Sequence, residues 1–515
     1  MKQLAIALVM LPGLLVLGAR HAQAQKKANP QKIAATITEE DLRRHLEIIA
    51  GPAMEGRETA TEGQRKAAAY IEDHFKSLGF MPGNHGSFQM EYPVYRDSLK
   101  AALLRVNEKS FALNTEFQPF LQFCRNGSQY FSELVMVGHG IVDSAYDDYG
   151  DIDVKGKAVL ILDGSPSSYS STKRGFRAPN SFYGKYMAAV KKGAAAVLMV
   201  GQGFPRQAAA SLGNMYLNLY SAVQQPSFFT ISANVAKAIA PDYEQLLQAG
   251  KTAAVPAKVY EADLALEVDK ALLHLKSSNV LGYIEGTDKK DEWLIVTAHY
   301  DHLGKRGDVI YYGADDDGSG TVGVLEIAEA FAKAKAAGKG PRRNVLFMTV
   351  SGEEKGLWGS EYFSEHPTIP MEKATADLNI DMIGRVDTER KLPDTLNYVY
   401  VVGDDKISTE LKPLSEGVNK KYIKMTLDYK YNDPNDQNQI YFRSDHYNFA
   451  RKGVPVIFYY DGMLQADYHK PTDTVDKINF ALLRKRAQLV FYTAWEMANR
   501  DAMMKRDLPV PTATR

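Results

Sequence analysis

Short apolar runs alternate with helix-like segments throughout the second half of this chain. The runs are NVLGYIEG, EWLIVTAHY, RRNVLFMTVSG, ADLNIDMIG, NYVYVVG and VPVIFYYDG, the first beginning at Asn279. Between them, residues 320–337 carry apolar side chains at helical spacing, and a final helix is expected over 480–504. Such alternation predicts an α/β fold with a mainly parallel sheet sandwiched by helices.

Polar side chains that favour metal ions stand where several of these strands should end. His299 and Asp301 follow the run WLIVT, Glu353 and Glu354 follow NVLFMTV, and Asp381 lies in LNIDM. In open α/β sheets, ligands bind at the carboxyl ends of the strands. We therefore expect these side chains to meet at one edge of the sheet.

The same region contains further carboxylates and a second imidazole. Asp315, Asp316 and Asp317 form the triplet in GADDDGSG, and His469 lies in YHKPTDT. Without a cation, gathering these carboxylates would cost several kcal/mol per buried charge or force protonation. Imidazole and carboxylate ligands without thiolates suit catalytic zinc, with manganese or cobalt as possible substitutes.

Charge, cysteine content and the N-terminal segment limit the functional classes. Lys plus Arg and Asp plus Glu both number 62, so the net charge is zero and gives no support to nucleic-acid binding. Residues 1–24 have the pattern of a cleavable signal peptide, which predicts a periplasmic or secreted protein. The apolar run is shorter than the ~20 residues that a span needs, so no stable membrane span is expected after cleavage. Cys124 is the single cysteine and is expected to be a small buried hydrophobe.

The pattern of residues divides the mature chain into four parts. Residues 25–94 should contain helices that pack on the catalytic domain, with helix starts at Thr38 and Thr61. Residues 95–260 carry short strand-like runs and lack a His/Asp/Glu cluster, which predicts a small β-rich or mixed insertion. Residues 261–505 form the predicted catalytic domain, and 506–515 a loose tail.

Taken together, the motifs resemble a known family. AHYDHLG, GADDDGSG, SGEEKGLWGS, LNIDMIG, YFRSDH and YHKPTDT are similar, in order and spacing, to the zinc-dependent di-metal exopeptidases. That family includes secreted bacterial leucine aminopeptidases, aminopeptidase Y and glutamate carboxypeptidase. The resemblance covers about residues 279–500 and implies two Zn²⁺ per chain with peptides as substrates.

The resemblance implies a division of the metal ligands between two sites. His299 and Asp381 correspond to ligands of one zinc, and Glu354 and His469 to ligands of the other. Asp316 corresponds to the carboxylate that bridges both zinc ions. Paired metals of this kind activate water for the hydrolysis of a peptide bond.

The resemblance also implies roles for residues that do not bind metal. Glu353 corresponds to the general base, and Asp301 to the group that orients His299. Tyr441 has the spacing of a tyrosine that stabilises the oxyanion in some members. A packed aromatic side chain is the alternative for Tyr441.

The predicted insertion has its own resemblance. The run GHGIVDSAYDDYGDIDVKGKAVLILDG is similar to a protease-associated domain, which in these exopeptidases often lies between the first helices and the metal-binding core. Such a unit could form a lid or restrict access to short peptides. The alternative is an unrelated small β insertion.

An exported aminopeptidase is the leading functional prediction, with three alternatives. A carboxypeptidase would need a basic pocket for the substrate carboxylate, for which Arg385, Arg443 and Lys470 are candidates. A glutaminyl cyclase of similar fold would use one zinc and lack the insertion. A receptor-like binding module without catalysis would be expected to lack ligands or the base, whereas this chain has the whole set.

Overall fold

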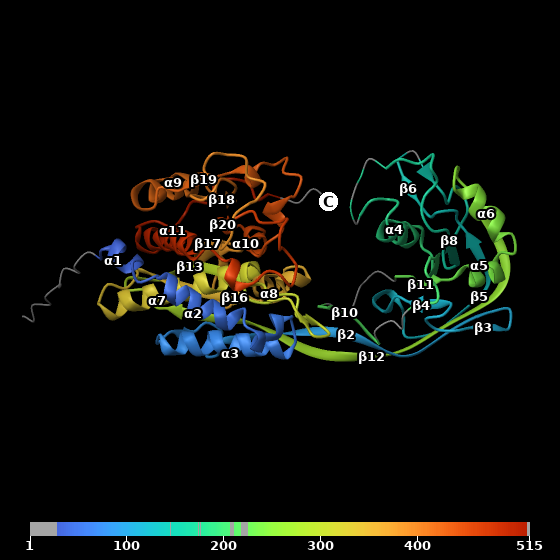
Figure 1. Cartoon of the computed structure of the whole chain (residues 1–515), viewed down its shortest axis with the longest axis horizontal. Coiled ribbons are helices and arrows are strands. Elements are labelled where there is room, and N and C mark those ends of the chain that lie inside the picture. Colours follow the sequence, from blue (N-terminus) through green and yellow to red (C-terminus); the bar gives the residue numbers. More distant parts are fainter. Residues whose placement is uncertain are drawn as a thin grey trace, which may run out of the picture.

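The chain folds into two bodies joined by a long arm (Figure 1). The structure is a computed structural model that describes residues 28–511 apart from 145, 172, 174, 176, 207–210 and 218–224. The predicted signal peptide, residues 1–24, lies outside the described residues, as do the last four residues of the predicted tail. Within the described part of the chain, no helix combines the length and the apolar character needed to cross a bilayer.

The larger body is built on a twisted sheet whose central strands are parallel. β13 runs parallel to β16 on one side and to β17 on the other, and β17 runs parallel to β20. β18 is parallel to β19 but antiparallel to β20, and β12 is antiparallel to β16. The prediction of a mainly parallel sheet is confirmed. In spatial order the strands are β19 (Thr426–Asp428), β18 (Tyr398–Val402), β20 (Val456–Tyr460), β17 (Ala374–Ile380), β13 (Lys289–His299), β16 (Arg343–Val350) and β12 (Lys258–Ile284).

Helices cover both faces of this sheet because its central strands are apolar on both sides. Successive side chains of β13 point to opposite faces, so Val296 packs in one core and Ile295 in the other. The first core is covered by α1 (Pro30–Ala34), α2 (Glu39–Ile49), α3 (Glu62–Ser77), α7 (Gly320–Ala336), α9 (Leu411–Tyr422) and α11 (Phe480–Asn499). The second is covered by α8 (Trp358–Glu365) and α10 (His446–Ala450).

The N-terminal helices begin where their sequence signals indicate. The Thr38 side chain caps α2 by accepting a hydrogen bond from the amide of Asp41 at 3.1 Å. α3 begins after Thr61 and packs Ile71 and Phe75 into the same core as α7. Residues 28–77 are therefore part of the catalytic body although they precede the insertion in the chain.

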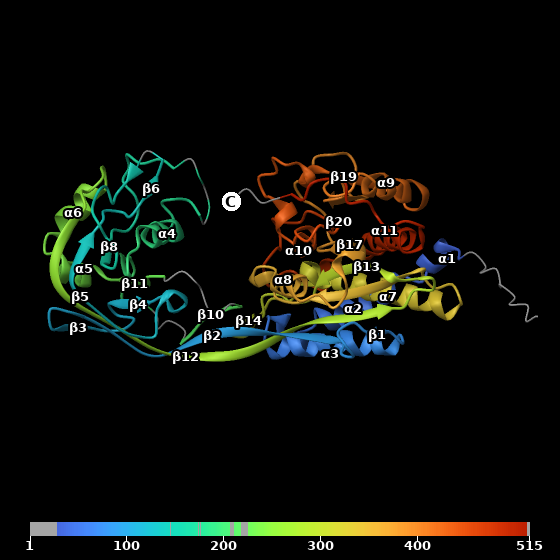
Figure 2. The same cartoon turned by 180° about the vertical axis from the view of Figure 1, so that it is seen from behind.

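Two long strands form the arm that joins the bodies (Figure 2). β2 (Gln89–Val106) pairs antiparallel with β12, and the pairing runs from Gln89 opposite Val280 to Val106 opposite Leu264. The domain limits predicted at 94/95 and 260/261 fall inside these strands. A strand that runs unbroken through both bodies has the same residue pattern on either side of such a limit, so the sequence does not mark it.

The smaller body is a compact α/β unit. β5 (Gly127–Met136), β8 (Ala158–Ile161), β9 (Ala196–Val200) and β11 (Ser227–Ile231) are parallel, and β4 (Phe117–Pro119) is antiparallel to β11. α4 (Phe182–Lys192) covers one face, and α5 (Ala233–Ile239) and α6 (Tyr243–Gly250) cover the other.

The remaining strands of the described chain are short. They are β1 (Met81–Pro82), β3 (Lys109–Phe111), β6 (Val142–Asp143), β7 (Tyr146–Asp147), β10 (Leu212–Tyr216), β14 (Lys305–Arg306) and β15 (Val309–Ile310).

Candidate metal centre

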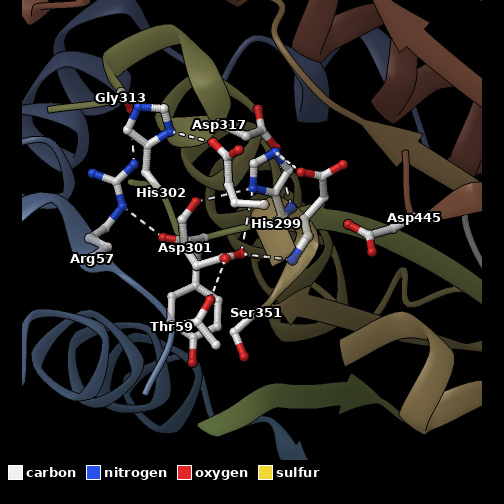
Figure 3. Close-up of polar contacts among 12 residues, drawn as sticks. Arg57, Thr59, His299, Asp301, His302, Gly313, Asp317, Ser351 and Asp445 are labelled. Carbon is white, nitrogen blue, oxygen red and sulfur yellow. Dashed lines mark hydrogen bonds and ion pairs between the residues drawn. The ribbon is translucent and has the colours of Figure 1, made fainter. Parts of the chain in front are cut away.

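The metal-favouring side chains lie together at the carboxyl edge of the central strands, and Figure 3 shows His299, His302 and Asp317 in this region. His299 is the last residue of β13, and Asp381 follows β17 directly. Glu353 and Glu354 begin the turn after β16, and Asp316 lies in the turn that precedes α7. The loop after β20 brings in a fifth element, which carries His469.

Asp316 lies between the two imidazoles. His299 Nε2 is 3.3 Å from Asp316 Oδ1 and 3.5 Å from Asp381 Oδ1. His469 Nε2 is 3.2 Å from Asp316 Oδ2 and 3.0 Å from Glu354 Oε2. The two oxygens of one carboxylate thus face two different ligand pairs, which is the arrangement of a bridging ligand.

The residues present fit a pair of divalent cations. His299 Nε2 is buried and has no hydrogen-bond partner, although buried polar atoms are usually satisfied. Burial alone would lower the pKa of His299, but the carboxylates of Asp381 and Glu353 raise it well above its ordinary value. Imidazole and carboxylate ligands of this kind are typical of catalytic zinc sites.

The acids on either side of Asp316 stabilise the backbone. Asp317 accepts hydrogen bonds from three backbone amides at 2.8 to 3.2 Å, and Asp315 accepts one from Gly384 at 2.8 Å. Asp473 accepts hydrogen bonds from the amides of Asp315 and Asp316 at 3.0 and 3.1 Å. The turn is therefore fixed by its neighbours, and the carboxylate of Asp316 is left to face the imidazoles.

A third imidazole, which the sequence reasoning missed, also belongs to the site. His302 is fully buried, with Nδ1 2.7 Å from Glu354 Oε1 and 3.9 Å from Asp316 Oδ2. His302 lies three residues after His299 in AHYDHLG, so its position in the motif was a usable signal. His302 Nδ1 contacts Oε1 of Glu354, whereas His469 contacts Oε2 of the same carboxylate.

Asp301 contacts His299, and its predicted role in orienting that imidazole stays a prediction. His299 Nδ1 is 3.1 Å from the backbone carbonyl of Asp301, whereas the Asp301 carboxylate is 3.7 Å away. That carboxylate instead accepts hydrogen bonds from the Thr59 hydroxyl at 2.7 Å and the Glu353 amide at 3.2 Å. Asp301 thus links the N-terminal segment to the turn that carries Glu353.

Arg57 is a second residue that the sequence reasoning did not identify. Its guanidinium is fully buried and donates hydrogen bonds to the carbonyls of Ile49, Tyr300, Tyr312 and Gly313 at 2.7 to 2.9 Å. The carbonyl acceptors compensate the cost of burying the charge. Arg57 therefore ties the end of α2 to the loop that joins β13 to the turn containing Asp316 (Figure 3).

Glu353 faces a small pocket beside the metal ligands. The pocket has a volume of about 30 Å³, and its lining includes Asp381, Met382, Phe458 and Leu464. Burial raises the pKa of the Glu353 carboxyl well above its ordinary value, and the charge of Asp381 adds to the rise while His299 opposes it. Glu353 faces the pocket, whereas Glu354 contacts His469.

The structure places Tyr441 away from the lining of this pocket. Its ring is 6% exposed, packs against His446 with 5.5 Å between ring centroids, and belongs to the core beneath α10. The predicted catalytic role of Tyr441 therefore stays a prediction, and the contacts are those of the packed-aromatic alternative.

Tyr468 is a phenol that lies beside the ligands, in a pocket that Tyr460 also lines. It lines the pocket, and its ring stacks on that of His469 with 3.8 Å between centroids. Its hydroxyl accepts a hydrogen bond from Arg443 at 3.3 Å. Burial raises the pKa of Tyr468, and Asp316 and Glu353 add to the rise, so the phenol keeps its proton. Tyr468 directly precedes His469 in the sequence, and this position was a usable signal that its phenol lies at the site.

Of the three basic residues considered for a substrate carboxylate, one reaches the pocket. Arg443 lines it. Arg385 is paired with Asp467 at 2.9 Å, and Lys470 donates hydrogen bonds to the carbonyls of its own loop.

The sheet and its edge of imidazoles and carboxylates define a hydrolase of the metallopeptidase class. Residues 279–494 match the model of peptidase family M28. The chain is 28% identical over 268 residues to a probable leucine aminopeptidase of Arthroderma otae, a match that covers 47% of this chain and 70% of the relative. It is 30% identical over 216 residues to one of Trichophyton verrucosum, which covers 41% of this chain and 55% of the relative.

A solved structure resembles the whole two-body chain. The aminopeptidase from Aneurinibacillus sp. strain AM-1 aligns with a TM-score of 0.57 and 21% identity, over 94% of this chain and all of that one. The likeness extends to the inserted body, because the match covers nearly the full length. The chain therefore has the fold of a peptidase with an insertion before the metal-favouring motifs.

Proposed function

We propose that this protein is an exported aminopeptidase that hydrolyses the N-terminal residue from peptides with two divalent cations, in the first instance zinc. The observation that carries the proposal is the placement of Asp316 between His299 and His469, with Glu353 beside them. The names of the curated relatives, probable leucine aminopeptidases, support the choice of substrate. Export rests on the signal-peptide pattern of residues 1–24.

The ligand sets follow from the contacts of the two imidazoles. His299 and Asp381 would hold one cation, His469 and Glu354 the other, and Asp316 both. When bound, such a pair supplies a more acidic water and a Lewis acid that polarises the scissile carbonyl.

The protein's own residues move the protons. Glu353 accepts a proton from the attacking water at its carboxylate, whose Oε2 lies 3.9 Å from His299 Nε2, and returns it to the leaving amine. The Asp301 carboxylate fixes this turn by accepting the Glu353 amide hydrogen bond. Tyr468 donates its phenolic proton in a hydrogen bond to the oxyanion that develops on the substrate, and Arg443 orients the phenol.

The lining of the pocket favours a free N-terminus with an apolar side chain. The carboxylates of Glu353 and Asp381 border the pocket and would attract the substrate ammonium group. Met382, Phe458 and Leu464 supply apolar surface for the first side chain.

The inserted body lies beside the catalytic body at the end of the β2/β12 arm (Figure 1). A separate cavity of about 850 Å³ lies between the arm and the turn after Glu354, and its lining includes Arg96, Met215, Lys355 and Trp358. We propose that the insertion is a protease-associated domain that limits access to short peptides.

One assay tests the direction of cleavage. Metal-stripped and zinc-restored protein is offered leucine p-nitroanilide, its N-acetylated form, and a peptide with a blocked N-terminus and a free carboxyl end. We expect zinc-dependent hydrolysis of the unblocked substrate alone. Release of the C-terminal residue from the blocked peptide would contradict the proposal.

A carboxypeptidase is the second candidate, and one observation favours it. Arg443 brings a guanidinium to the pocket lining, where a substrate carboxylate could pair with it. Arg443→Gln separates the two functions. It should raise KM for the blocked peptide if Arg443 binds a carboxylate, and lower kcat for leucine p-nitroanilide if it only orients Tyr468.

A further inference from the structure

A second group of metal-favouring side chains lies among the helices, away from the strand ends. His45 comes from α2, His74 from α3, and Glu326 and Glu329 from α7. One ligand atom from each of His45, His74 and Glu329 lies within 4.8 Å of the others. The imidazoles of His45 and His74 meet edge to face, with 4.7 Å between centroids.

Several polar atoms of this helix cluster are buried and have no partner. They are Nε2 of His45, Nε2 of His74 and both carboxylate oxygens of Glu326. His45 is 3% exposed and Glu326 is 1% exposed, so water does not satisfy these atoms. His45 Nε2 and Glu326 Oε1 are 3.6 Å apart, which is too far for a hydrogen bond but suits two ligands of one cation. Unsatisfied buried groups are costly, and a cation between them removes the cost.

The other ring nitrogen of His45 is already engaged. His45 Nδ1 lies 2.6 Å from the Tyr70 hydroxyl. Histidines that bind metal almost always use one nitrogen for the ion and fix the other with a hydrogen bond of this kind. Nε2 of His45 is therefore the nitrogen left to face an ion.

The charges of the cluster also match a cation. The cluster brings two carboxylates and two imidazoles together. Lys333 Nζ pairs with Glu329 Oε1 at 2.5 Å, and this leaves the second oxygen of Glu329 for an ion.

We propose that His45, His74, Glu326 and Glu329 bind a structural divalent cation of the zinc class, distinct from the pair at the strand ends. Two imidazoles and two carboxylates complete four-coordination and neutralise a divalent charge, with no position left for a substrate. The ion would join α2 and α3 to α7, whose first residue follows the Asp316 turn. It would thereby fix the N-terminal helices on the body that carries the catalytic residues.

Counting bound metal in the full-length chain tests the proposal. The double variant Asp316→Ala/His469→Ala removes ligands of the strand-end pair, so after chelation and dialysis against zinc it should retain one zinc per chain. Adding His74→Ala should remove that zinc, whereas adding His85→Ala, at an exposed histidine, should not. No zinc in the folded double variant, or zinc that survives His74→Ala, would overturn the proposal.

A comparison in the otherwise unaltered protein covers the case in which the double variant does not fold. His74→Ala alone should bind one zinc fewer than the wild type and the His85→Ala control, with hydrolysis of leucine p-nitroanilide retained. It should also lose part of the rise in thermal unfolding temperature that zinc produces. Equal zinc content in wild type and His74→Ala would contradict the site.

Discussion

Both bodies of this protein contain parallel strands covered by helices, yet metal-favouring side chains gather in only one. In the catalytic body, five separate segments bring imidazoles and carboxylates to one edge. In the described part of the inserted body, no three potential ligands come together in this way. Its buried Lys185 instead donates to the carbonyls of Leu162 and Gly164, and Cys124 donates to that of Phe228. A parallel sheet provides an edge, but the residues at its strand ends decide whether a site forms.

Substitution of Asp316 should have the largest effect on metal content and activity. Asp316→Ala removes the carboxylate that faces both imidazoles, so both cations should be lost from the strand-end site and activity should fall below detection. Metal analysis by mass spectrometry, with Asp151→Ala on the surface of the inserted body as the control, checks this. Unchanged metal content would contradict the bridging role.

Glu353→Gln should have the next largest effect. The amide keeps the shape of the side chain but does not accept the proton, so kcat should fall roughly 100- to 10,000-fold. Metal content should stay at the wild-type value, because Glu353 is not among the proposed ligands. Glu365→Gln, at an exposed acid of α8, is the matched control. Activity near the wild-type rate would exclude Glu353 as the base.

Substitutions of two tyrosines should have smaller effects on kcat and should separate the roles of these two side chains. Tyr468→Phe removes the phenol beside His469 and should lower kcat by roughly 100- to 1,000-fold, with KM little changed. Tyr441→Phe alters a packed ring outside the pocket and should leave kcat within a few-fold of wild type. A larger loss of kcat in Tyr441→Phe than in Tyr468→Phe would support the role predicted for Tyr441.

The smallest effect on activity is expected in the inserted body. Lys185→Met should leave kcat unchanged but alter the pH dependence of stability. Burial lowers the pKa of Lys185 to about 8, so the cost of its buried charge is full below pH 8 and is relieved as pH rises toward about 10.5. The wild type should therefore gain unfolding free energy over this interval, by up to about 1.4 kcal/mol per pH unit, and Lys185→Met should lack this gain.

Urea unfolding between pH 7 and 10 measures the difference. Lys191→Met, at an exposed position of the same helix, is the control and should follow the wild type. Parallel pH profiles for Lys185→Met and wild type would show that the buried charge of Lys185 does not affect stability.

The site residues that could be predicted from the sequence are those that directly follow a predicted strand. His299, Glu353 and Asp381 each follow an apolar run, so the rule that places ligands at carboxyl ends locates them without knowledge of the packing. The helix that begins after Thr38 is similarly set by a local cap.

The residues that the sequence did not indicate depend on contacts between distant segments. Arg57 lies in a short turn without a pattern, and its importance comes from carbonyls more than 240 residues further along the chain. Tyr468 and Tyr441 are equally plausible phenols in the sequence, and only the path of the loop after β20 decides which reaches the pocket. The limits of the inserted body are hidden because β2 and β12 run through both bodies.

Anomalous diffraction at the zinc edge, from crystals of the protein grown with zinc, would locate the cations themselves. Two peaks are expected in contact with the two oxygens of Asp316, one also bound by His299 and Asp381 and the other by His469 and Glu354. A single peak, or none, next to Asp316 would contradict the paired-cation site.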